Sequence, residues 1–150
     1  MKSIVLLLIL NLTGGFLLYG QVNTPDDRQR KAITVLIDQY SQARETMDTA
    51  LLKTILTADV DQLVSTGEWR NGKRAAVEGM LKSSAGSPGT RTLLVDKIRM
   101  ISSTSAIVDC RYEIQNTEGA IRKMWSSFIV VGDKKSWKIT AIRNMLPSGQ

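Results

Sequence analysis

The stretch Ala106-Ile107-Val108-Asp109-Cys110-Arg111-Tyr112-Glu113-Ile114-Gln115 alternates apolar and polar side chains over most of its length. Because successive residues of a β-strand point to opposite faces of the sheet, this alternation predicts a strand with one buried face and one solvated face. The buried face would carry the even-numbered residues, and the other face Asp109, Arg111 and Glu113. Such a strand needs a second layer to cover its apolar face.

The segments around this strand predict an antiparallel meander. A strand over 92–100 precedes it, with Ser102-Ser103 as the turn, and Thr117-Glu118-Gly119 leads into a strand over 121–131. Residues 132–135 then turn the chain into a last strand over 137–145, which Pro147 ends.

The preceding part of the chain predicts helices. Thr24 and Pro25 are typical of a helix start, and apolar residues recur at steps of three and four over 25–46. Asp48 can cap a second, shorter helix, and a short strand over 61–66 and a third helix over 73–82 follow before a loop at 83–90. The fold class we predict is α+β: a cone of three N-terminal helices packed on a curved antiparallel sheet.

The first twenty residues have the pattern of a secretory signal peptide. A positive start at Lys2 precedes the unbroken apolar run 4–10, and small residues close the segment before Gln21. We therefore expect a signal peptide at 1–20, one domain at 21–150, and a secreted or periplasmic location. The protein would contact a membrane only if this segment stays uncleaved as an anchor.

The composition excludes several kinds of chemistry. The chain has no histidine and one cysteine, Cys110, so histidine-dependent triads, histidine metal centres and paired-cysteine zinc sites are ruled out. We expect no metal and no cofactor, and a buried Cys110. The net charge of +6 comes from scattered basic residues without a nucleic-acid motif, so we expect no nucleic-acid partner.

The order of elements and four stretches resemble the SnoaL-like, domain-of-unknown-function 4440 branch of the nuclear-transport-factor-2-like superfamily. The stretches are Leu63-Val64-Ser65-Thr66-Gly67-Glu68-Trp69-Arg70-Asn71-Gly72, Cys110-Arg111-Tyr112-Glu113-Ile114, Arg122-Lys123-Met124-Trp125-Ser126-Ser127-Phe128 and Trp137-Lys138-Ile139-Thr140-Ala141-Ile142-Arg143-Asn144-Met145-Leu146-Pro147. The resemblance covers about residues 25–147 and implies a cone-shaped α+β barrel. It does not specify a function, because this fold hosts many unrelated activities.

The ketosteroid isomerases of this superfamily offer one comparison by residue. Their helix tyrosine corresponds to Tyr40, but their base and second acid fall near Ser65 and Ser126. A serine hydroxyl does not abstract a carbon-bound proton unaided, so the resemblance does not imply that isomerase chemistry here.

Five residues are candidates for ligand binding. Trp69 and Arg70 lie where the mouth of the cone is expected and could stack on and hydrogen-bond a planar or anionic ligand. Tyr40 and Trp125 could line the pocket, and Arg143 shares the parity of the apolar residues Trp137 and Ile139. The alternative for each is an ordinary role in the core or at the surface.

Asp109 is a weak candidate for a general base. If its face of the strand were concave, desolvation could raise its pKa; if convex, Asp109, Arg111 and Glu113 would form cross-strand ion pairs at the surface or in a dimer interface.

Three hypotheses follow. The first is an exported domain whose pocket binds a small hydrophobic or anionic molecule, and which forms a homodimer through the sheet face. The second is a cofactor-independent SnoaL-type enzyme, isomerase- or cyclase-like, using Asp109. The third is a dimeric protein-interaction module whose partner surface is the open sheet face.

Overall fold

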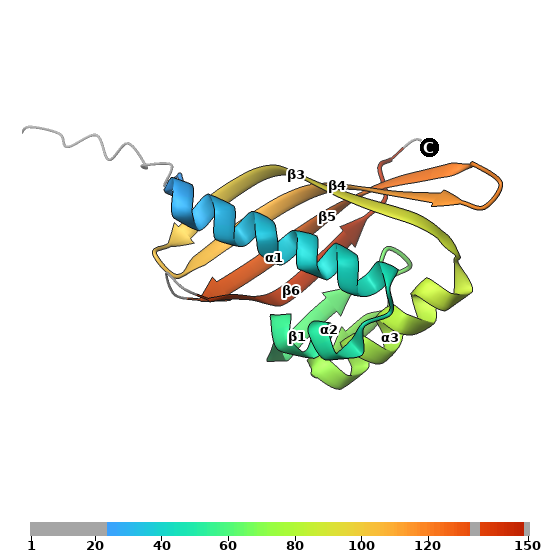
Figure 1. Ribbon diagram of the computed structural model, residues 1–150, viewed down its shortest axis with the longest axis horizontal. Helices are drawn as coiled ribbons and strands as arrows, with labels where there is room; N and C mark the ends of the chain where they lie inside the picture. Colours follow the sequence, from blue (N-terminus) through green and yellow to red (C-terminus); the bar gives the residue numbers. More distant parts are fainter. Residues whose placement is uncertain (1–23, 133–135, 149–150) are drawn as a thin grey trace, which may run out of the picture.

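The computed structural model describes residues 24–132 and 136–148. Three helices cover one face of a curved, unclosed six-stranded sheet (Figure 1), which confirms the predicted α+β class and cone-like layering. The predicted signal peptide at 1–20 lies outside the described residues. Within the described residues, no helix has both the length and the apolar content needed to cross a bilayer.

The helices are α1 (Asp27–Glu45), α2 (Thr49–Ile55) and α3 (Gly72–Gly86). The strands are β1 (Leu56–Leu63), β2 (Trp69–Asn71), β3 (Gly89–Ser102), β4 (Ser105–Asn116), β5 (Ile121–Gly132) and β6 (Trp137–Met145). Their order across the sheet is β2-β1-β6-β5-β4-β3. Every neighbouring pair is antiparallel, as predicted, except β1 and β6, which run parallel.

Side-chain caps decide where the first two helices begin. Asp26 caps α1 through a reciprocal pair of bonds with Gln29: Gln29 N donates to Asp26 Oδ1 at 2.7 Å and Asp26 N donates to Gln29 Oε1 at 3.1 Å. The predicted cap, Thr24, is therefore two residues too early. Asp48 caps α2 as predicted, accepting from Leu51 N at 2.9 Å.

Several element boundaries differ from those predicted, and the short strand β2 was not predicted. The first strand begins at Leu56 rather than at 61, and α3 continues to Gly86 through part of the segment predicted as a loop. This serine-rich stretch has a weak intrinsic preference for helix. Because Ser84 within it is buried, tertiary packing stabilises the helical conformation there.

The core lies between α1 and the inner face of the sheet, by which we mean the face covered by the helices. Tyr40 of α1 meets Phe128 of β5 edge to face, with ring centroids 5.2 Å apart. The predicted alternation of β4 is confirmed, because Ala106, Val108 and Cys110 are all fully buried. Trp137 is also buried.

The contact between β2 and α3 depends on a glycine. Arg70 of β2 lies so close to Gly79 of α3 that a Cβ on Gly79 would be 2.3 Å from Arg70 Nε and 2.5 Å from its Cδ. Any larger residue at position 79 must therefore displace the Arg70 side chain.

We predict that Gly79→Ala destabilises the protein by about 1–3 kcal/mol, because overpacking outweighs the better helix propensity of alanine. Gly86→Ala is the matched control in the same helix, since a Cβ there meets nothing within 4 Å. Urea unfolding of both variants provides the measurement, and equal stability of the two would contradict the predicted clash.

Candidate functional site

The five sequence-predicted ligand residues are divided between the two faces of the sheet. Tyr40 and Arg70 lie on the inner side, whereas Trp69, Trp125 and Arg143 lie on the outer face, which is the one turned away from the helices. No single pocket can therefore be formed by all five. Their individual ligand-binding roles stay predictions.

Tyr40 is a fully packed core residue. Its side chain is 2% exposed and meets Phe128 edge to face. Burial raises the pKa of Tyr40 above its ordinary value of 10.0, so the phenol is neutral near pH 7. The interior of the cone at this level is filled by side chains.

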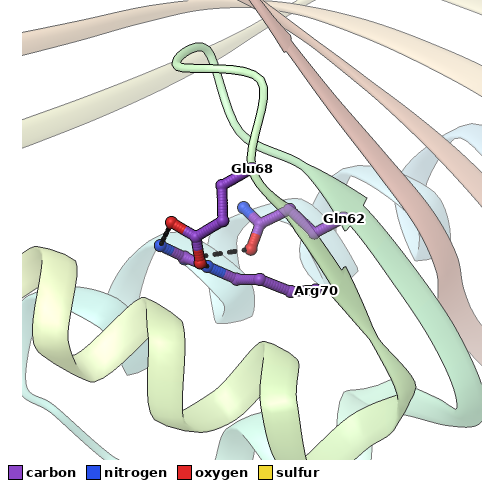
Figure 2. Close-up of polar contacts among 3 residues, drawn as sticks. All are labelled: Gln62, Glu68 and Arg70. Carbon is purple, nitrogen blue, oxygen red and sulfur yellow. Dashed lines mark hydrogen bonds and ion pairs between the residues drawn. The ribbon is translucent and has the colours of Figure 1, made fainter.

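Arg70 is buried and forms an ion pair with a carboxylate of this chain. Figure 2 shows Glu68 and Gln62 converging on its guanidinium. Arg70 Nε donates to Glu68 Oε1 at 2.8 Å, Nη2 donates to Glu68 Oε2 at 3.4 Å, and Nη1 donates to Gln62 Oε1 at 3.3 Å. The hydrogen bonds from Arg70, then its charge, lower the pKa of Glu68 below its ordinary value of 4.5. The Arg70 guanidinium is thus already neutralised by this chain.

Arg44 is a polar inner residue that the sequence analysis did not single out. Its Nη1 donates to the hydroxyl of Tyr112 at 3.1 Å, and its Cζ lies 5.8 Å from the Tyr40 ring centroid and 5.9 Å from that of Tyr112. The signal was its spacing, four residues after Tyr40 on the buried stripe of α1. The helix ends at Glu45, one residue beyond Arg44, and Met47 is 55% exposed.

Arg143 lies on the face opposite to the one that its parity indicated. The β5–β6 pairing shifts register between Ile129 and Val130, which leaves Thr140 as an extra residue in β6. From there onward Ile142 faces the core and Arg143 pairs with Ser127 on the outer face. The prediction that Arg143 shares the side of Trp137 and Ile139 is therefore wrong, because a bulge changes the alternation.

Arg143 takes part in an outer-face cluster with Trp69 and Asp61. Its Nη1 lies 2.7 Å from Asp61 Oδ1, and its Cζ lies 4.8 Å from the Trp69 ring centroid. Trp69 remains 52% exposed. This cluster lies on the outer face of the sheet, away from the helices.

Asp109 also faces outward, where it accepts a hydrogen bond from Ser127 Oγ at 2.5 Å. Its neighbours on this face form ion pairs, Arg111 with Asp96 at 3.3 Å and Lys123 with Glu113 at 3.8 Å. Exposed pairs of this kind contribute about 0–1 kcal/mol each. Asp109 is therefore not placed to act as a base inside the cone.

Cys110 faces the core and is fully buried, as expected. Burial, with smaller contributions from Asp109, Asp96 and Asp38, raises the pKa of its thiol to about 12. The thiol therefore stays protonated near pH 7 and is a poor nucleophile. Within residues 24–132 and 136–148, no group of three or more potential histidine, cysteine or carboxylate ligands is close enough to hold a metal ion.

One end of the inner face is polar. We call it the polar end: the end at which β3 and β5 begin and β4 and β6 finish. Ser126 donates to Asn144 Oδ1 at 2.6 Å there, and Arg44 bonds to Tyr112. A hollow of about 320 Å³ opens at this end, lined by residues from the ends of α1 and α3 and the start of β3, among them Arg44, Ser84 and Arg91.

Of the other hollows formed by the described residues, two bear on the sequence predictions or on size. One of about 260 Å³ is lined by Trp125 and Pro147 together with Arg111, Glu113 and Lys123. The other, about 560 Å³, lies on the surface between α2 and α3. Neither contains Asp109, and the Trp125 hollow is the only one of the three lined by a sequence-predicted ligand residue.

Neither the protein-family models nor the sequences of curated proteins give a match to this chain. Solved structures do match. An NTF-2-like protein of unknown function from Shewanella oneidensis is 18% identical, with a TM-score of 0.65, covering 77% of this chain and 98% of that one. A cystatin-like-fold domain of unknown function from Nostoc punctiforme is 14% identical, with a TM-score of 0.72 and coverage of 82% and 80%.

This chain has the NTF2-like fold. A third match with this fold, from Novosphingobium aromaticivorans and provisionally described as an aromatic ring hydroxylase, is 18% identical, with a TM-score of 0.69 and coverage of 82% and 92%. At such identities the NTF2-like fold is shared but no activity follows, because sites vary independently of the fold.

The Glu68–Arg70 pair predicts a pH dependence of stability. A carboxyl group whose pKa is lower in the folded state stabilises the fold above its unfolded-state pKa, and this contribution is lost as the pH falls through the folded-state pKa. We expect Glu68→Gln to lower the melting temperature near pH 7, and the difference from wild type to shrink as the pH falls below about 4.5.

Glu118→Gln, which removes an exposed carboxylate from the β4–β5 turn, is the matched control for thermal unfolding across this pH range. A Glu68→Gln difference that is independent of pH would contradict a stabilising ion pair with Arg70.

Proposed function

We propose that this protein is a small-molecule-binding domain that takes its ligand at the polar end of the cone. The single observation that supports this proposal is the change in the inner face from apolar to polar at that end, next to a hollow of about 320 Å³. Burying polar groups costs free energy that an apolar core avoids. Small-molecule sites are concave and place a small number of polar groups within an otherwise apolar lining.

Two finer parts of the proposal depend on sequence. The stretches around Trp69, Tyr112, Trp125 and Trp137 support membership of the SnoaL-like, domain-of-unknown-function 4440 branch. The apolar run 4–10 and the small residues before Gln21 support export, so the ligand would be met outside the cytoplasm. No chemistry is assigned, and the outward position of Asp109 favours binding over the SnoaL-type enzyme.

Ala85→Trp tests the proposed site, because Ala85 is exposed yet lines the hollow, so an indole there fills it without disturbing the core. A screen by thermal shift and native mass spectrometry should find a compound that stabilises wild type by about 2.7 kcal/mol at 100 times its Kd. Ala85→Trp should lose this response, whereas Lys82→Trp, exposed on the same helix, should keep it. An Ala85→Trp variant that still responds would overturn the location.

A second function, assembly of two copies through the outer face, is favoured by a different observation. Trp125 and Met145 are paired neighbours on that face, 40% and 45% exposed, and Leu94 near them is 53% exposed. Around them lie both signs of charge, Glu113 with Lys123 and Arg111 with Asp96. A two-fold axis can therefore bring unlike charges together around an apolar centre.

We expect light scattering to show a dimer that Trp125→Arg converts to a monomer, because an arginine at the centre of the interface is buried without a partner. Val35→Arg is the matched control, since Val35 is 45% exposed but lies on α1. A monomeric wild-type protein, or a Trp125→Arg dimer, would count against assembly through this face.

A further inference from the structure

We propose that the polar-end hollow binds the carboxylate of a small monocarboxylic acid between Arg44, Ser84 and Arg91. This inference rests on the proposed function and names the chemical class of its ligand. It follows from three observations: two buried guanidinium groups without a carboxylate partner, three unsatisfied polar atoms on residues that line one hollow, and a lining whose charge and apolar wall suit a monoanion.

Arg44 and Arg91 are buried charges whose guanidinium groups have no carboxylate partner within the described residues. They are 6% and 9% exposed, and neither makes an ion pair with any carboxylate in residues 24–132 or 136–148. Arg44 Nη1 donates to the Tyr112 hydroxyl. Arg91 donates from Nη2 to Ser87 O at 2.6 Å and from Nη1 to Gly89 O at 3.2 Å. All of these acceptors are neutral groups.

Arg70 has the carboxylate partner that the guanidinium groups of Arg44 and Arg91 lack. Arg70 is buried to the same degree, at 8% exposed, but it receives a carboxylate from Glu68. A buried guanidinium without a counter-ion is unfavourable, because a low-dielectric surrounding stabilises a charge poorly. Tyr40, whose ring lies against Arg44, is neutral near pH 7 and supplies no such charge.

Three polar atoms of the residues around the hollow have no hydrogen-bond partner: Arg44 Nε, Arg91 Nε and Ser84 Oγ. The three residues come from α1, β3 and α3 respectively and all line the same hollow, while the three atoms themselves are closed off from solvent. Buried polar atoms are almost always satisfied in folded proteins, and a carboxylate can accept from several donors at once. A carboxylate bound in the hollow would give the guanidinium groups of Arg44 and Arg91 a charged acceptor.

The remainder of the lining narrows the class of anion. Glu45 also borders the hollow, and its Oε2 accepts from the backbone N of Arg91 at 3.4 Å. Two arginines and one glutamate leave a net charge of +1, which suits a single carboxylate better than a phosphate dianion. Met47, Ala85 and Pro88 provide an apolar wall for the body of the acid, and about 320 Å³ admits only a small one.

An alternative role for the arginines is to offset the negative C-terminal ends of α1 and α3, which both finish here. Arg91, which donates to Ser87 O beside the end of α3, fits this role. Arg44 does not fully fit it, because its Nη1 is used on Tyr112 and its Nε has no partner. The two roles differ in a measurable way, since a purely structural arginine would not respond to an added acid.

The test uses the protein with hexanoate, hexanamide and inorganic phosphate as probes, in calorimetry and in NMR of the arginine Nε–H groups. We expect hexanoate to bind at least about tenfold more tightly than hexanamide and to shift the Nε–H resonances of Arg44 and Arg91. Arg44→Gln should remove most of this preference, whereas Arg30→Gln, an equal charge change on the exposed side of α1, should change affinity less than about twofold.

The outcomes separate the two proposals. Equal binding of hexanoate and hexanamide, both lost in Ala85→Trp, would overturn the carboxylate site and leave the binding function standing. Tighter binding of phosphate would replace the carboxylate with a phosphoryl ligand. No response to hexanoate in either measurement would refute the carboxylate site, whatever the library screen finds. The comparison of probes uses the wild-type protein, so it remains a test even if Arg44→Gln fails to fold.

Discussion

The packing of α1 across the inner face of the sheet is the constraint on which the rest of this structure depends. The edge-to-face contact of Tyr40 with Phe128 brings the middle of the helix down onto β5, and α1 also contacts β3 and β6 (Figure 1). Because side chains fill the cone at this level, the hollow proposed for the ligand lies beyond it, toward the end where α1 stops. The position of the polar end is thus a consequence of where the helix packs tightly.

Charged side chains have different surroundings on the two faces of the sheet. On the outer face, charged residues pair with one another at the surface, where such pairs contribute little and can rearrange. On the inner side, each guanidinium is nearly closed off from water, so its partners matter far more. The guanidinium of Arg70 has Glu68, whereas those of Arg44 and Arg91 have only neutral acceptors, and the proposed ligand site follows from this difference.

Much of the fold could be predicted from local pattern. The alternation in 106–115 gave the inner and outer residues of β4 correctly, because a strand without a bulge keeps its period of two. The same argument failed for Arg143, since the extra residue at Thr140 inverts the alternation in β6. Sequence pattern also did not single out Arg44, because an arginine is expected at the surface even when its spacing matches the buried residues of a helix. Its burial follows only from where α1 ends and which residues lie around it.

By itself, the sequence determined the α+β class, the helix capped by Asp48, the buried alternation of β4 and the absence of histidine chemistry, because these depend only on residue type and on spacing along the chain. The tertiary structure alone decided which arginines have a carboxylate, which face Asp109 and Arg143 occupy, and where the hollow lies. These properties depend on contacts between residues far apart in the chain, such as Arg44 with Tyr112, and on a bulge in register that no local pattern reveals.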